Sequence, residues 1–151
     1  MSSHERVKVG GWLTLFCVLL TIIFPLAALG GMSNAIDLSK PGSGIDQYVA
    51  GALSINAFTG FVFGVYSFFC GLTIWRGSRD GKREAYTYLI IYPIAFLFVN
   101  SFLLLRLEDI NGLGVVQVQF ALISDIFSKI LFSLVWILYF RFSKRIKHTY
   151  G

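Results

Sequence analysis

Residues 84–106 read EAYTYLIIYPIAFLFVNSFLLLR, and no charged residue lies between Glu84 and Arg106. A helix needs about 20 predominantly apolar residues to cross the hydrocarbon core of a membrane, and this run is long enough. Its apolar residues do not alternate with polar ones, as they would in the strands of a membrane β-barrel. The stretch therefore predicts a membrane-spanning helix.

Three further spans flank this run. No charged residue lies between Lys8 and Asp37 or between Asp46 and Arg76, and a last run is apolar except for two charged residues. The chain is 56% hydrophobic and only 14% charged, whereas a soluble domain has about 25% charged residues. We therefore predict an all-α fold, an integral membrane four-helix bundle in which residues 1–151 form a single transmembrane domain. The predicted spans cover residues 11–30, 53–75, 85–105 and 118–140.

Basic residues gather on one side of this layout. Ten Lys and Arg residues flank the spans on that side: Arg6, Lys8, Arg76, Arg79, Lys82, Arg83, Arg141, Lys144, Arg145 and Lys147. The other side has only Lys40 and Arg106. The positive-inside rule then predicts that both termini are cytoplasmic. This clustering also explains the net charge of +5, so no nucleic-acid partner is expected.

The basic tail that contains Lys144, Arg145 and Lys147 has two interpretations. It either fixes topology or also binds anionic lipid headgroups, at about 1 kcal/mol per basic residue. At the other terminus, the apolar stretch after the basic segment resembles a signal peptide. It is longer than the usual 7–15 apolar residues of such a peptide, so we expect it to be retained.

Several positions predict local structure. The segment from about Gly31 to Ala52 is rich in Gly, Ser and Asn, which predicts a flexible outer loop. Asp46 is expected to cap a helix that begins above the membrane. Pro25 and Pro93 lie within spans and are expected to bend them, because proline removes a backbone hydrogen bond.

Small residues line one face of the second span, namely Gly60, Gly64, Ser67 and Gly71. Such a face lets two helix backbones approach closely. Two interpretations stay open at this point: packing within the bundle of one chain, or formation of a homodimer.

The fourth span carries an acid and a base, Asp125 and Lys129. A rise of about 1.5 Å per residue places Lys129 near the middle of the span. Acid before base at i, i+4 is the favourable orientation for a helical ion pair. Pairing offsets part of the insertion penalty, about 2.5–3.5 kcal/mol for each charge. We therefore expect an ion pair on the bundle-facing side.

Further polar residues lie at similar depth. Gln117, Ser124 and Ser128 are expected to share a polar stripe with the pair, and Asn100, Asn56 and Arg106 are expected nearby on other spans. These residues define a candidate polar site in the outer half of the bundle. Intramembrane ionisable residues often mark binding sites or proton relays. The alternative is that the pair only fixes the register of the helices.

Catalytic and metal-binding motifs are missing from the sequence. It has no CxxC, HExxH, P-loop, GxGxxG or GxSxG pattern, and Cys17 and Cys70 fall within apolar runs. Both cysteines are most simply small buried hydrophobic residues. We therefore expect no enzyme activity, no catalytic or metal-binding residues and no cofactor.

The two ends of the chain resemble a known family. Residues 9–20 read VGGWLTLFCVLL, and residues 136–151 read WILYFRFSKRIKHTYG. They resemble the DUF2569 family of small bacterial membrane proteins, which open with a GGWL-like segment and close with W-x-x-Y-F and SKR-(V/I)-K-x-T-(F/Y). The resemblance implies four spans in the bacterial inner membrane and argues against signal cleavage. The family has no assigned activity, so no catalytic residue is carried over.

Two functions follow as hypotheses. The first is an accessory or structural protein that binds the lipid bilayer and other membrane proteins, with a homo-oligomer left open. The second is a small transporter or channel subunit that uses Asp125 and Lys129 as an intramembrane polar site.

Overall fold

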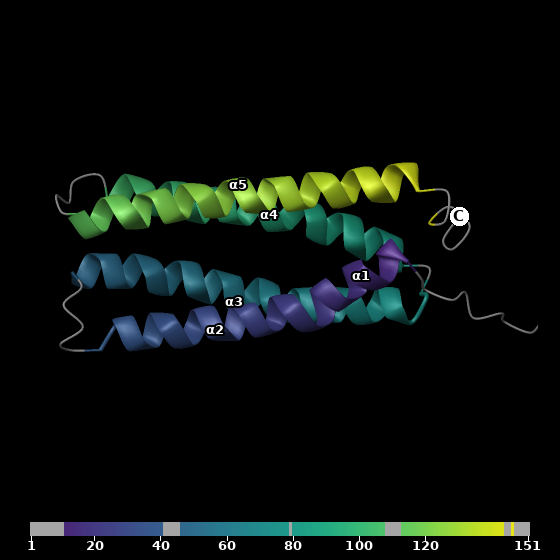
Figure 1. Cartoon of the computed structure of the whole chain (residues 1–151), viewed down its shortest axis with the longest axis horizontal. Helices are drawn as coiled ribbons and strands as arrows, with labels where there is room; N and C mark the ends of the chain where they lie inside the picture. The colour runs from purple at the N-terminus through teal and green to yellow at the C-terminus, as the bar shows by residue number, and fades with distance from the viewer. Residues whose placement is uncertain (1–10, 41–45, 79, 108–112, 144–145, 147–151) are drawn as a thin grey trace, which may run out of the picture.

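Four long helical spans run side by side along the molecule (Figure 1). The computed structural model describes residues 11–40, 46–78, 80–107, 113–143 and 146. The first span is continuous and comprises α1 (Trp12–Val18), the π-helical turn η1 (Leu19–Ile23) and α2 (Phe24–Leu38), and the others are α3 (Gln47–Trp75), α4 (Gly81–Leu107) and α5 (Leu113–Phe142). All four are long and apolar enough to cross a membrane, which confirms the predicted four-span, all-α fold.

The helices extend beyond the predicted spans at one end of the bundle. Most of the expected first outer loop is helical, because α2 continues to Leu38 and α3 begins at Gln47. The Ser39 and Ser54 hydroxyl oxygens lie 3.0 Å apart there, so the packing of α2 on α3 continues past the apolar runs. Asp46 caps α3 as predicted, since its carboxylate accepts a hydrogen bond from the Tyr48 N–H at 2.8 Å.

The first span bends at the π-helical turn. The Phe24 N–H bonds to the Leu19 carbonyl five residues back, which widens the helix just before Pro25. Pro25 has no N–H, and its ring would crowd the carbonyl of Thr21 in a regular α-helix. Figure 1 shows α1 leaving the line of α2 and rising toward α5. The bend predicted at Pro25 is confirmed. α4 continues through Pro93 as one helix, and the bend expected there stays a prediction.

Two hydrophobic clusters hold the bundle together. Near the end where α1 begins, the Phe16 ring packs 4.5 Å from Trp136 and 5.2 Å from Phe140 of α5, measured between ring centroids. At the opposite end, Ala52, Leu107 and Leu122 belong to a second cluster formed by α3, α4 and α5. Aromatic contacts therefore join the first span to α5 where α1 lies, whereas α2 packs on α3.

The small-residue face of α3 packs within the chain. A Cβ added at Gly64 would lie 2.6 Å from the Ala28 Cβ, and one added at Gly71 would lie 2.5 Å from the Thr21 Cγ2. The Ser67 hydroxyl donates to the Leu20 carbonyl of the first span at 3.0 Å. Gly64, Ser67 and Gly71 of this face therefore contact the first span of the same chain. Gly60 differs, because the nearest atom to an added Cβ is on the Phe96 ring, 3.9 Å away.

Large apolar side chains cover the outside of the bundle. Phe98, Phe120 and Phe127 are each at least two-thirds exposed, as are Tyr48 and Phe142 near helix ends. Such a surface requires a hydrocarbon environment. The helices therefore contact the lipid bilayer, as predicted.

Candidate functional site

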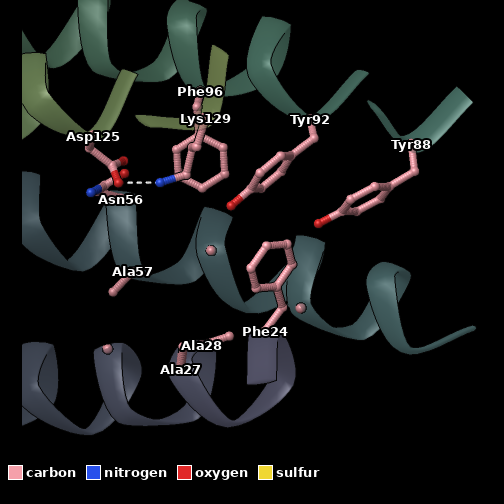
Figure 2. A pocket seen from close by; sticks show the side chains of 13 residues that line it. Phe24, Ala27, Ala28, Asn56, Ala57, Tyr88, Tyr92, Phe96, Asp125 and Lys129 are labelled. Atoms are coloured by element: carbon pink, nitrogen blue, oxygen red, sulfur yellow. Dashed lines mark hydrogen bonds and ion pairs between the residues drawn. The ribbon is translucent and has the colours of Figure 1, made fainter. Parts of the chain in front are cut away.

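A cavity of about 340 Å³ lies near the middle of the four spans. Figure 2 shows its lining side chains. They come from α2 (Phe24, Ala27, Ala28, Gly31), α3 (Asn56, Ala57, Gly60, Gly64), α4 (Tyr88, Tyr92, Phe96) and α5 (Asp125, Lys129). The bend of the first span and the two flanking clusters explain its position. α1 reaches α5 on one side of the bend, and α2 stays on α3 on the other.

The walls of the cavity differ in chemistry. Alanine and glycine dominate the side formed by α2 and α3, which leaves space because these residues have little or no side chain. Tyr88, Tyr92 and Phe96 recur every four residues and therefore share one face of α4. The ring centroid of Tyr92 lies 5.2 Å from the ring centroid of Tyr88 and 5.2 Å from that of Phe96. Among the described residues that line the cavity, only Asp125 and Lys129 of α5 are charged.

Asp125 and Lys129 form the predicted ion pair. The Lys129 ammonium donates to the Asp125 carboxylate across one turn of α5, and both side chains are largely buried. A second helix also contacts the carboxylate, because the Asn100 amide nitrogen on α4 donates to Asp125 Oδ2 at 3.1 Å. The same nitrogen lies 3.3 Å from the Leu122 carbonyl oxygen. The pair thus belongs to the contact between α4 and α5.

The ammonium of Lys129 also lies against aromatic rings. Its Nζ is 4.1 Å from the centroid of Phe96 and 5.8 Å from that of Tyr92. Ring faces carry partial negative charge and attract cations within about 6 Å. The cation is therefore contacted by a carboxylate and by the two rings of α4, as Figure 2 shows.

Two amide oxygens near the pair are acceptors without a hydrogen-bond donor among the described residues. They are Oδ1 of Asn56, which lines the cavity from α3, and Oδ1 of Asn100. A buried acceptor without a donor is unfavourable by about 1–3 kcal/mol. Asn56 therefore brings to the cavity wall a buried amide oxygen whose hydrogen-bonding capacity is unused among the described residues.

Three residues of the expected polar stripe do not join the cavity. The side chains of Gln117, Ser124 and Ser128 are exposed, and the Ser128 hydroxyl donates to the Ser124 carbonyl of its own helix at 2.8 Å. At about 100° per residue, Ser128 points about 100° and Ser124 about 140° away from Lys129. That rotation turns both serines toward the lipid-facing side, so the expectation that they share the bundle-facing side is wrong.

Arg106 also lies apart from the cavity. Its side chain is exposed, and its guanidinium carbon lies 5.3 Å from the centroid of the Phe102 ring, near the end of α4. The arginine is therefore too far along α4 to join Asp125. The tail residues Lys144, Arg145 and Lys147 lie outside the described part of the chain.

Sequence reasoning missed the aromatic wall. Tyr88, Tyr92 and Phe96 appear in the sequence as three of many aromatic residues in an apolar run. Their four-residue spacing is the signal that places them on one face, and that face also contains Asn100 four residues further on. The cavity thus offers one carboxylate, one ammonium, two phenols, an amide and ring faces. Among the residues that the structure describes, no three His, Cys, Asp or Glu side chains form a metal-binding group.

A family comparison covers nearly the whole chain. The family model described as "Protein of unknown function (DUF2569)" matches residues 6–151. The comparison with curated proteins found no match, and neither did the comparison with solved structures.

Proposed function

Because the chain belongs to the DUF2569 family, a family of unknown function, we propose a function from the cavity itself. The protein is a small transporter or channel subunit that binds a small polar solute between its helices. Asp125 and Lys129 are the binding groups, and Asn56 supplies a further polar contact. The observation that carries this proposal is the position of the ion pair beside a cavity rather than in a filled core.

A purely structural ion pair predicts a different environment. Protein interiors are close-packed, and a pair that only fixes helix register gains nothing from open space beside it. Here the pair borders about 340 Å³ of space, and Asn56 in the lining of that space has a buried amide oxygen with no donor among the described residues. Cavities of this size suit small ligands, and intramembrane charges commonly mark solute pathways.

The accessory-protein hypothesis loses one of its main supports. It drew on the small-residue face of α3 as a surface for another membrane protein. Gly64, Ser67 and Gly71 instead contact the first span of the same chain. This face therefore no longer favours an external partner, whereas the cavity favours a solute.

The cellular setting belongs to the same proposal. The basic residues that flank the spans support cytoplasmic termini, and the bacterial inner membrane is the location that the family resemblance implies. The protein acts without catalysis or a cofactor. Since one small bundle encloses only part of a pathway, transport by this protein requires a homo-oligomer. A reporter enzyme fused to the C-terminus, active only outside the cytoplasm, tests the topology, and activity of that fusion would contradict it.

Proteoliposomes test the transport function. Purified protein is reconstituted, and proton flux is followed with an entrapped pH dye alongside uptake of radiolabelled tetraethylammonium, acetate and betaine. We expect flux of at least one of them, reduced about tenfold or more in Asp125→Asn because a charged hydrogen-bond partner is lost. Gly60→Leu should also reduce it by filling the cavity. The exposed variant Ser128→Leu is the matched control in α5.

Two outcomes decide the proposal. Flux by the wild type and by Ser128→Leu, with loss in the two cavity variants, supports it. Absence of any flux from a folded wild-type protein, or equal flux in all variants, overturns it.

A further inference from the structure

We propose that the solute is a small organic monocation, and that Lys129 occupies its binding place while the cavity is empty. This inference rests on the proposed function and specifies the charge class of the ligand. It starts from the surroundings of one atom, the Lys129 Nζ. That ammonium pairs with the Asp125 carboxylate and lies 4.1 Å from the centroid of the Phe96 ring.

The groups around Lys129 are those that recognise cations. A carboxylate supplies the full negative charge, and the faces of Phe96 and Tyr92 supply the partial negative charge of aromatic rings. This combination of an acid with aromatic faces binds quaternary ammonium and other organic cations in many proteins. The side chain of Lys129 itself therefore shows what the place accepts: an ammonium on an apolar stem.

The same surroundings disfavour an anion. An anion near Lys129 would also lie near Asp125, which already neutralises the ammonium. It would further meet the negative faces of Phe96 and Tyr92. Arg106, a cationic residue near the end of α4, is exposed and does not line the cavity.

The opposite wall suits the apolar part of such a ligand. Ala27, Ala28, Ala57 and Gly60 present small side chains or none, and the Phe24 ring extends into the cavity from α2 (Figure 2). Methyl or ethyl groups on a cation would pack there without an unpaired polar atom. Asn56 Oδ1 would accept a hydrogen bond if the cation carries an N–H or O–H.

Charge balance links ligand binding to a proton. Within the part of the chain that the structure describes, Asp125 is the only carboxylate in the lining, so it neutralises one cation at a time. When a monocation takes the place beside Asp125, the Lys129 ammonium loses its proton to water and becomes a neutral amine. One positive charge enters, one proton leaves, and the net charge of the cavity is unchanged. Among the described residues that line the cavity, the other titratable groups are the Tyr88 and Tyr92 phenols of α4, which stay neutral in this exchange.

Binding of tetraethylammonium to the purified protein in lipid nanodiscs tests the inference. The variant Lys129→Met keeps a stem of similar length but removes the competing cation. We expect it to bind radiolabelled tetraethylammonium about tenfold tighter or more than the wild type at pH 7, because an occupied site lowers apparent affinity. The double variant Asp125→Asn with Lys129→Met should bind no better than the wild type, and Ser128→Met is the matched control.

A pH series provides the second measurement and uses only the wild type. Because binding of one cation releases one proton, the affinity of the wild type for tetraethylammonium should increase by up to about tenfold for each unit by which the pH is raised. In Lys129→Met that pH dependence should disappear. If Lys129→Met does not fold, the wild-type series alone decides, and affinity independent of pH overturns the inference.

An acetate arm separates this inference from the proposed function. Tighter tetraethylammonium binding by folded Lys129→Met supports the monocation. Equal or weaker binding overturns it. Acetate binding by the wild type that Lys129→Met loses would overturn the monocation class while the solute site stands. If none of tetraethylammonium, acetate and betaine binds any form, and the liposomes show no flux, both proposals fail.

Discussion

The Asn100 amide nitrogen on α4 donates a hydrogen bond to Asp125 Oδ2 on α5 at a distance of 3.1 Å. Asn100 is fully buried, and its amide nitrogen is also 3.3 Å from the Leu122 carbonyl oxygen. The ion pair of α5 is therefore anchored to the helix that carries the aromatic wall. Through this contact, Asn100 fixes the carboxylate with respect to the rings of Phe96 and Tyr92.

Replacing Asn100 by leucine should destabilise the bundle. The variant loses the bond between α4 and α5 and leaves the carboxylate with Lys129 alone. Hydrogen bonds between membrane helices contribute about 0.6–2 kcal/mol, so we expect a loss of that size in the free energy of unfolding. Unfolding in mixed micelles of increasing SDS content measures it. Ser101→Leu, at the next and exposed position of α4, is the control, and an equal loss there would contradict the assignment.

The two charges should be coupled in stability. Asp125→Asn or Lys129→Met alone leaves one buried charge without its partner, and each is expected to lower the free energy of unfolding by about 3 kcal/mol. The double variant removes both charges and should lose less than the sum. A double-mutant cycle from the same SDS unfolding curves gives the coupling, expected at about 1–3 kcal/mol. Additive losses would show that the two side chains do not depend on each other.

Substitution by alanine should lower the free energy of unfolding at Gly64 but not at Gly60, although both glycines lie on the same face of α3. At Gly64 the new methyl would meet the Ala28 Cβ at 2.6 Å, so we expect Gly64→Ala to lose about 1–3 kcal/mol through overpacking. At Gly60 the new methyl would lie 3.9 Å from the Phe96 ring and would point into the cavity. Gly60→Ala should therefore be neutral or slightly stabilising. Similar losses at both positions in SDS unfolding would refute this difference.

The sequence predicted the spans because hydrophobic length alone determines which segments can cross a membrane. The ends of the helices depend on something else. The start of α3 at Gln47 was indicated by its cap, Asp46, but α2 runs on to Leu38 because it continues to pack on α3 beyond the apolar run, with Ser39 against Ser54. Glycine and serine content indicated a loop, and tertiary contacts overrode that preference.

The site was predictable only where spacing fixes geometry. The i, i+4 spacing of Asp125 and Lys129 was enough to predict their pairing. Ser124 and Ser128 were assigned to the wrong side because the direction that faces the bundle depends on how α5 packs on α4. Tyr92 and Phe96 were missed because an aromatic residue in an apolar run fits a lipid-facing position as well as a cavity wall.

The C-terminal segment should contribute to stability through Ile146. This side chain has no exposed surface and belongs to the cluster that contains Phe16 and Ile74. Ile→Ala substitutions in packed cores are unfavourable by about 2–5 kcal/mol, so Ile146→Ala should lower the free energy of unfolding within that range. Phe142→Ala is the control, because Phe142 is 70% exposed at the end of α5. SDS unfolding of both variants measures the difference. A loss in Phe142→Ala that matched or exceeded that in Ile146→Ala would show that the tail does not anchor on the core.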